Sequence, residues 1–255
     1  GTVAVAATHQ DPERARVRLD ASGKFAAIRR SNLRVSPDDN EDRSSARAAA
    51  AAPGMDNDRA KCDRFNTLLS EGHALSQRGD LRGALAKYVE CRACGKTIRD
   101  ASLARKAEGV ALGSLGLAYD SLGQYREAIE HHEQHLAIAR EIGDRNGEGK
   151  ALGNLGIAYH SLGQYREAIE HHEQDLAIAR EIGDRYGEGK ALGNLGMAYF
   201  RLGQYREAIE HHEQHLAIAR EIGDRNGEGK ALGNLGNAYD SLGQYREAIE
   251  HHEQH

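Results

Sequence analysis

The sequence predicts a mainly α-helical protein built as an α-solenoid, in which similar helix pairs stack and bury only their neighbours. A block of 40 residues recurs almost letter for letter, and one copy at 151–190 reads ALGNLGIAYHSLGQYREAIEHHEQDLAIAREIGDRYGEGK. Repeats of this length are typical of solenoids. Tryptophan is absent, aromatic residues make up 5% of the chain and the mean hydropathy is −0.69, which suits a thin, elongated core. All three prolines lie before residue 54, so the rest of the chain can form uninterrupted helices.

The copies divide the C-terminal part into units 109–148, 149–188, 189–228 and a shortened 229–255, and each unit predicts two helices. Asp144 should cap the first helix, because its carboxylate can accept from free N–H groups. Gly143 and Gly163 should close helices in the left-handed conformation. We expect Gly156 to let the second helix approach closely, with Ala168 as the small contact across the hairpin. The apolar faces, at steps of three and four residues, are Ala151, Leu152, Leu155, Ala158, Tyr159 and Leu162 in the first helix, and Tyr165, Ala168, Ile169, His172, Leu176, Ala179 and Ile182 in the second.

The spacing of the small and aromatic residues resembles a known repeat signature. Leu155-Gly156, Tyr159, Gly163 and Ala168 resemble the tetratricopeptide repeat. Arg180 stands where that repeat usually has proline, so the second helix should run on and lengthen the unit from about 34 residues. This longer form resembles the Leu-Gly-Asn (Pins-like) group of the family. The resemblance implies a right-handed superhelix that holds another protein in a concave groove lined by the first helices.

Residues 58–108 resemble a degenerate copy of the same hairpin. Gly72, Leu75, Gly79 and Tyr88 fall at the offsets of the regular units, as does Ala84, whereas the connection that follows is longer. Arg92 replaces the usual buried leucine of the second helix.

The sequence of residues 1–35 predicts a small β segment. Residues 14–19, RARVRL, alternate apolar side chains with arginines, which is typical of a half-buried strand. A turn at 20–23 and a return strand at 24–29 should follow. With short strands at 2–6 and 32–35, this segment resembles the end of an SH3-like barrel. Residues 36–57 are polar and alanine-rich, and we expect a disordered linker there.

Three motifs suggest chemistry, and each is better explained without it. His131 and His135 of HHEQH lie one helical turn apart, as a metal site could require, but the motif lacks zincin spacing. We expect His132 to be a partly buried residue that packs between the helices, with solvated neighbours. The 147–151 segment GEGKA lacks the first glycine and the hydroxyl residue of a phosphate loop, and Cys91 and Cys94 form a single pair. We therefore expect no enzyme activity, no cofactor and no metal.

Composition limits the partners. The net charge of −5 argues against nucleic acid over most of the chain, although arginines at 14, 16, 18, 29, 30 and 34 leave phosphate contact open at the N-terminus. No apolar run approaches the roughly 18 residues that span a membrane. Three cysteines without a disulfide framework indicate a reducing compartment, so we expect a cytoplasmic location.

Spacing along the first helices picks out the positions that should face the groove. Most differences between the copies fall there, a pattern that drift at solvated sites would also give. A row of asparagines offers donors and acceptors to the backbone of an extended peptide, and Phe200 is the aromatic expected to anchor a partner at unit 189–228. The predicted groove residues are Lys150, Asn154, Ile157, His160, Lys190, Asn194, Met197, Phe200, Arg201, Lys230, Asn234, Asn237 and Asp240.

These features predict a scaffold or adaptor that binds a peptide or helix of a partner protein. One alternative is a regulatory array cut from a larger enzyme of protease or kinase type, or from a signalling protein, because the chain begins without Met and ends within a predicted helix. Another is self-association through the exposed face of the last hairpin.

Overall fold

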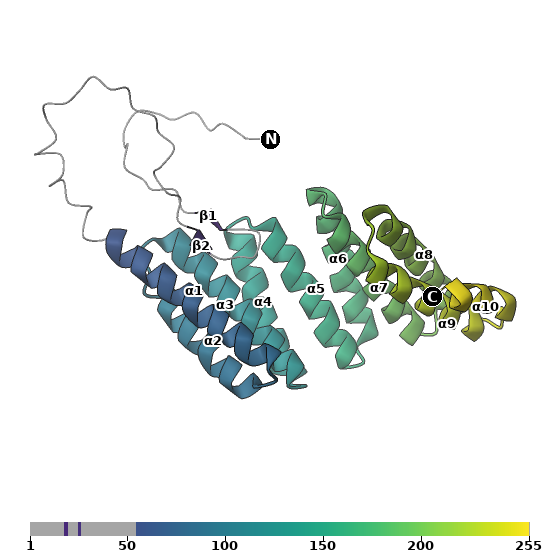
Figure 1. The fold of residues 1–255 in the computed structure, drawn as a ribbon, viewed down its shortest axis with the longest axis horizontal. Coiled ribbons are helices and arrows are strands. Elements are labelled where there is room, and N and C mark those ends of the chain that lie inside the picture. The colour runs from purple at the N-terminus through teal and green to yellow at the C-terminus, as the bar shows by residue number, and fades with distance from the viewer. Residues whose placement is uncertain (1–17, 20–24, 27–54, 255) are drawn as a thin grey trace, which may run out of the picture.

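The computed structural model describes residues 18–19, 25–26 and 55–254, and it is mainly α-helical. From residue 55 onward, helices follow one another with short turns, as Figure 1 shows. Their bounds are α1 Met55–Gln77, α2 Leu81–Gly95, α3 Ala101–Ser121, α4 Tyr125–Glu141, α5 Arg145–Ser161, α6 Tyr165–Ile182, α7 Arg185–Arg201, α8 Tyr205–Ile222, α9 Arg225–Ser241 and α10 Tyr245–Gln254.

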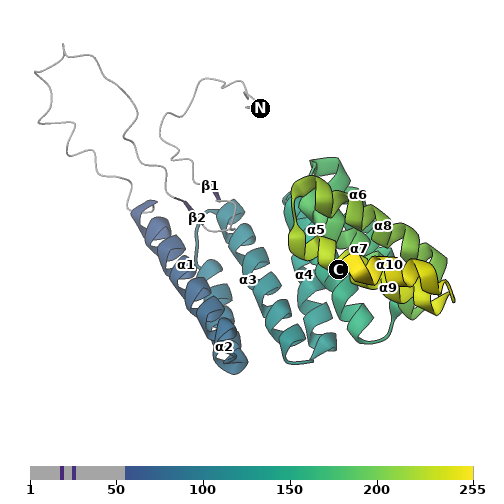
Figure 2. The ribbon, with the colours of Figure 1, turned by 45° about the vertical axis from the view of Figure 1, so that its right-hand side comes forward.

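The helices form a stack of hairpins, as the sequence predicted. Each helix packs against the helix before it and the helix after it in the chain, and the turned view in Figure 2 shows the pairs following one another along the array. The buried apolar residues form separate clusters between successive hairpins. One cluster joins Ile129 of α4, Leu155 of α5 and Ile178 of α6. The core is therefore thin and divided along the array, because every pair of helices shields the next.

Capping residues set the helix ends. The Asp144 Oδ1 atom accepts a hydrogen bond from the Gly147 N–H at 2.9 Å, and Asp184 and Asp224 do the same one and two hairpins later. Gly143 has φ of +68° and Gly163 has φ of +77°, a conformation that glycine adopts without the strain other residues would suffer. The predicted starts and stops of the first helices are confirmed.

Gly156 makes room for a buried ring. A Cβ atom at this position would lie 2.4 Å from Cε1 of His172, whose side chain is 1% exposed. The predicted close approach of the two helices is confirmed, but the group that fills the space is His172. Ala168 is also fully buried. The same arrangement recurs at Gly116 with His132 and, further along, at Gly196 with His212.

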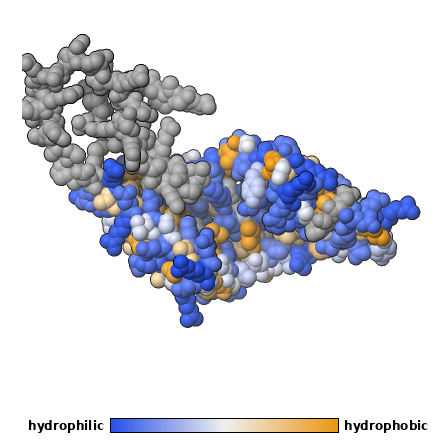
Figure 3. Space-filling view, viewed as in Figure 1, coloured by the Kyte–Doolittle hydropathy of each residue, from blue (hydrophilic) through white to orange (hydrophobic). Residues whose placement is uncertain are grey.

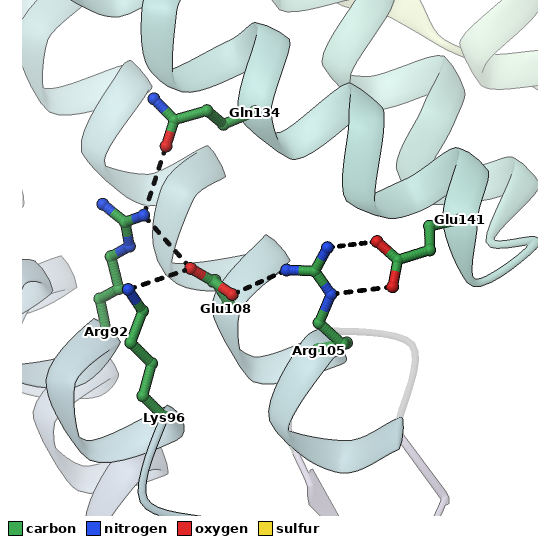
Figure 4. A network of polar contacts seen from close by, with 6 residues as sticks. All are labelled: Arg92, Lys96, Arg105, Glu108, Gln134 and Glu141. Atoms are coloured by element: carbon green, nitrogen blue, oxygen red, sulfur yellow. Dashed lines mark hydrogen bonds and ion pairs between the residues drawn. The ribbon is translucent and has the colours of Figure 1, made fainter. Parts of the chain in front are cut away.

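Ion pairs join successive hairpins on the side of the array shown in Figure 4. Glu108 receives Arg92 from the preceding hairpin at 3.2 Å and Arg105 from its own helix at 3.0 Å, and Arg105 also pairs with Glu141 of α4. The pattern repeats around Glu148, Glu188 and Glu228. We call this set the arginine–glutamate ladder.

The carboxylates of the ladder are held in their charged form. Burial raises the pKa of Glu148, but hydrogen bonds from Arg140 and Arg145 outweigh burial, so the pKa lies below its ordinary value. Glu148 is 7% exposed. A buried carboxylate with two guanidinium partners fixes how one hairpin sits on the next, because its remaining lone pairs have few alternatives.

The first hairpin repeats this plan with larger side chains. The ring of Tyr88 fills the space over Gly72, where a Cβ atom would lie 2.4 Å from it, as His132 does over Gly116. Arg92, which replaces the usual buried leucine, is half-buried and reaches the ladder. Arg92 lies one helical turn before Lys96, and Lys96 also contacts Glu108, at 3.4 Å. The repeat boundary at residue 58 stays a prediction.

Two short strands are described near the N-terminus. β1, Arg18–Leu19, pairs antiparallel with β2, Phe25–Ala26, in the register Arg18 to Ala26 and Leu19 to Phe25. They fall within the segments 14–19 and 24–29. The SH3-like fragment and most of the linker 36–57 lie outside the described residues, although α1 already begins at Met55. Of the helices described, none is both long and apolar enough to cross a membrane.

Candidate functional site

The first helices of the hairpins form the inner layer of the array. Helix α5 contacts α3 and α7, and α7 contacts α9, whereas among the described helices no such contact joins α4 to α6 or α6 to α8. The stack therefore curves with its first helices on the inner side. On the face drawn in Figure 3 the surface is largely hydrophilic, with separate hydrophobic patches.

The polar residues predicted for the groove lie on these first helices. Lys150, Lys190 and Lys230 are exposed, and the asparagines at 154, 194 and 234 are half-buried. For the residues that the structure describes, no ion pair involves these lysines and no hydrogen bond involves these amides. The groups are thus free to bind something else.

A pocket of about 180 Å³ opens among the helices of three successive hairpins. It brings together six of the predicted residues and one that the sequence did not single out, His212 of α8. The lining residues are His160 of α5, Met197, Phe200 and Arg201 of α7, His212, and Asn234 and Asn237 of α9. The other predicted residues, Lys150, Asn154, Ile157, Lys190, Asn194, Lys230 and Asp240, are outside this lining.

Phe200 forms a wall of the pocket and is also part of the core. Its side chain is half-buried, and its ring centroid lies 5.3 Å from that of Tyr205. It also packs against the buried cluster that includes Ile209 and Leu235. Met197, by contrast, is 41% exposed. The apolar contact surface of the pocket is therefore shared between a fixed ring and an adaptable thioether side chain.

The charges around the pocket are positive. Arg201 lines it, Lys190 and Lys230 lie on the same helices as its other residues, and none of the three has an ion-pair partner among the described residues. Burial and the Arg201 guanidinium lower the pKa of His160, so this imidazole is neutral at pH 7. Asp240, the acidic residue predicted for the groove, is not part of the lining, and neither is Asp120, which contacts His132 at 3.0 Å.

Tyr186 is an inner-side aromatic that the sequence argument missed. It is 58% exposed, and the Lys190 ammonium lies 6.0 Å from the centre of its ring. Because it precedes Lys190 by one helical turn, it continues the same stripe toward Asn194. The signal was present in the comparison of copies, since the equivalent residues are Asn146 and Asn226.

The HHEQH segments lie between the helices. His131 stacks on Tyr119 with ring centroids 5.1 Å apart. His132 packs between the helices, as predicted, but it is fully rather than partly buried. The expectation of solvated neighbours was wrong, because His135 packs over Gly109 and Gly113 and burial lowers its pKa to about 4. Glycines on the first helix leave the room that these rings occupy. No cluster of three metal-ligating side chains is found in the described part of the chain.

Comparison with known families gives one match. The model of the family described as tetratricopeptide repeat matches residues 108–181 and 187–255, which together make up more than half of the chain. Among curated protein sequences, none matches this chain.

Solved structures with similar folds cover most of the array. The nearly identical TPR-like repeats of a Podosopora anserina protein assigned as a kinesin light chain share 26% identity, with a TM-score of 0.64 over 75% of this chain and 92% of that one. BtubC (BKLC) from P. vanneervenii shares 18% identity, with a TM-score of 0.67 over 79% and 87%. The apo form of RapI shares 17%, with a TM-score of 0.68 over 75% and 68%. The last two likenesses concern the fold alone.

Proposed function

Since the chain belongs to the tetratricopeptide repeat family, we propose that it is a non-catalytic scaffold that binds an extended, acidic segment of a partner protein on the inner side of the array. The observation that carries this proposal is the pocket around Arg201. Its guanidinium has no ion-pair partner in the described part of the chain, and it lies beside the apolar side chains of Met197 and Phe200. Such a combination suits a peptide with a carboxylate next to an apolar residue.

The asparagine row supports an extended backbone as the ligand. Asn154, Asn194 and Asn234 recur once per hairpin along the inner layer, and their amides make no hydrogen bond within the described residues. An amide offers a donor and an acceptor together, which is the pattern that a peptide group presents. A peptide lying along this row would pass the pocket, because Asn234 belongs to both.

Related folds support a binding role. The structure of a Rap protein has been solved in complex with Competence and Sporulation Factor. That protein shares 18% identity with this chain, with a TM-score of 0.63, over 74% of the length of this chain. Within the family, the 40-residue units favour the Leu-Gly-Asn type. We place the protein in the cytoplasm, because Cys62, Cys91 and Cys94 are all unpaired.

Self-association through the last hairpin stays a prediction. Ile249 of α10 is 58% exposed, whereas Ile209, at the same position one hairpin earlier, is 8% exposed under the following unit.

The test is a peptide-display selection against the whole chain, followed by affinity measurement of the consensus peptide by fluorescence anisotropy. We expect acidic consensus peptides, and we expect Arg201→Ser to weaken their binding about tenfold. Serine is the residue that units 109–148, 149–188 and 229–255 carry at this position. The matched control is Arg166→Ser, which removes an equal charge from the exposed start of α6 and should leave affinity unchanged. Equal losses in the two variants, or a consensus without acidic residues, would contradict the proposal.

A further inference from the structure

Each regular hairpin has a layer of imidazoles between its two helices. His132, His172 and His212 are each at most 1% exposed. Their rings lie over glycines of the first helix, so closely that a Cβ atom at Gly116 or Gly196 would stand 2.3 or 2.4 Å from the nearest ring atom. Rings buried this deeply lose most of the hydration that a charged imidazolium would need. Proton uptake must therefore compete with closure of the hairpin.

The hairpins differ in the carboxylates that accompany these rings. In α3–α4, the Asp120 carboxylate lies 3.0 Å from Nε2 of His132 and would stabilise a protonated ring. In α5–α6, Asp175 occupies the place that His135 and His215 hold in the other hairpins. Burial raises the pKa of Asp175 to about 7. This carboxylate therefore binds a proton in the folded chain as pH falls, and burying the neutral group no longer destabilises the hairpin. Both hairpins thus contain a compensating acid.

The hairpin α7–α8 has no such acid between its helices. Phe200 stands at the position of Asp120, and His215 stands at the position of Asp175. The titratable groups that act on His212 are His211 and His215 of its own helix, and His160 of α5 and Arg201 of α7 share the pocket with it. Burial lowers the pKa of His215, Asp224 at the start of α9 raises it, and Lys230 of α9 lowers it further. The same opposed pair, Asp144 and Lys150, acts on His135.

We propose that α7–α8 is the acid-labile hairpin of the array, and that mild acidification opens it, and with it the pocket, before the hairpins on its N-terminal side open. The pocket depends on this hairpin, because Met197, Phe200 and Arg201 come from α7 and His212 from α8. Release of a bound peptide at low pH would follow. That consequence rests on the proposed function, whereas the opening itself concerns the free protein.

The direction follows from where protons bind. Burial lowers the pKa of His212 to about 4 and also lowers the pKa of His215. An unfolded histidine titrates near 6.5. Between these values the open hairpin binds more protons than the closed one, so falling pH favours opening. At pH 5.5 His212, with a folded pKa of about 4, favours the open form by about tenfold, and His215 acts in the same direction.

The experiment is hydrogen exchange with mass spectrometry on the free, full chain at pH 7.5 and 5.5, corrected for the intrinsic exchange rates. Peptides from the first helices can be assigned, because the sequences LAYDS, IAYHS and MAYFR distinguish α3, α5 and α7. We expect the protection of α7 to fall at least about tenfold more than that of α3 or α5. An equal fall in all three helices would overturn the proposal.

A pair of variants tests the cause. Phe200→Asp gives His212 the carboxylate that His132 has in α3–α4, and the residue is tolerated at this position in two other units, as Asp120 and Asp240. It should bring the acid-induced loss of protection in α7 close to that in α3. Phe200→Leu, the control, removes the aromatic ring without adding a carboxylate and should keep the full loss. If the two variants behave alike, the proposal is wrong. No partner is needed, so this result is independent of the peptide-binding test.

Discussion

Units 149–188 and 189–228 differ at five positions in otherwise identical sequence. The pairs are Ile157 and Met197, His160 and Phe200, Ser161 and Arg201, Asp175 and His215, and Tyr186 and Asn226. Four of the pairs lie on first helices, where side chains reach solvent or the pocket. The fifth lies between the helices of a hairpin. The comparison shows that the repeat keeps its packing residues constant and varies its inner side, with one exception that changes the chemistry of a buried position.

The buried exception has a measurable cost. Asp175 faces Gly149 and Gly153 of α5, and a Cβ atom at Gly153 would lie 2.7 Å from its Oδ2 atom. Burial raises its pKa to about 7, against the partial compensation that Lys190 offers. His215, in the same surroundings, has its pKa lowered by burial and is neutral at pH 7.5. One unit thus hides a carboxylate that is ionised in the unfolded chain, whereas its neighbour hides a neutral ring.

The largest effect is therefore expected at this position. Asp175→His should raise the free energy of unfolding at pH 7.5 by about 3 kcal/mol, because it removes the cost of burying a carboxyl group that ionises freely when unfolded. A carboxyl group with a raised pKa destabilises the fold only above its unfolded pKa, so the gain should shrink as pH falls from 7 toward 4. Urea denaturation at pH 7.5 and 4.5 measures both.

The reverse substitution is the matched control. His215→Asp places the carboxyl group over Gly189 and Gly193 in the neighbouring hairpin and should destabilise the chain at pH 7.5 by a similar amount. If ionisation is responsible, the two variants must change the free energy of unfolding at pH 7.5 in opposite directions. A stabilising Asp175→His that gains as much at pH 4.5 as at pH 7.5 would show that packing, not ionisation, is responsible.

The constant glycines that face a buried ring should be intolerant even of small changes. Gly156→Ala should lower the free energy of unfolding by about 2 kcal/mol, because its new methyl group would lie 2.4 Å from the buried His172 ring. In Gly149→Ala the nearest atoms stand at 3.2 and 3.3 Å, and the gain in helix propensity of about 1 kcal/mol should offset the contact. Thermal denaturation compares the two. If both alanines stabilise the array, the buried ring does not limit the distance between the helices.

Much of the array followed from the sequence because its signals are local. The aspartate caps at 144, 184 and 224 and the glycines that follow the helices of the regular units act within one turn of the chain, so spacing alone placed them. The residues expected to face the groove were chosen by helical periodicity in the same way, and their role stays a prediction.

What the sequence argument missed depends on contacts between hairpins. The ladder joins Arg140 to Glu148 and Gln174, which both belong to the next hairpin. No pattern within one unit shows which of these side chains meet. His212 entered the pocket for the same reason, since its ring reaches residues of α7 and α9 across two interfaces. The half-buried state of Phe200 likewise depends on the cluster of the following unit.

The smallest expected effect concerns the ladder, the constant feature that joins the two units. Glu188→Gln should lower the free energy of unfolding at pH 7 by about 1 kcal/mol, because it weakens charge-assisted hydrogen bonds from Arg180 and Arg185. Burial raises the pKa of Glu188, but those hydrogen bonds outweigh burial and leave it lowered. Its contribution is therefore present above the unfolded pKa and should vanish as pH falls below about 4. Glu228→Gln should cost less, because that side chain is 17% exposed against 9% and its partner Arg225 is 90% exposed. Equal losses in urea denaturation would mean that the ladder stabilises through long-range charge alone.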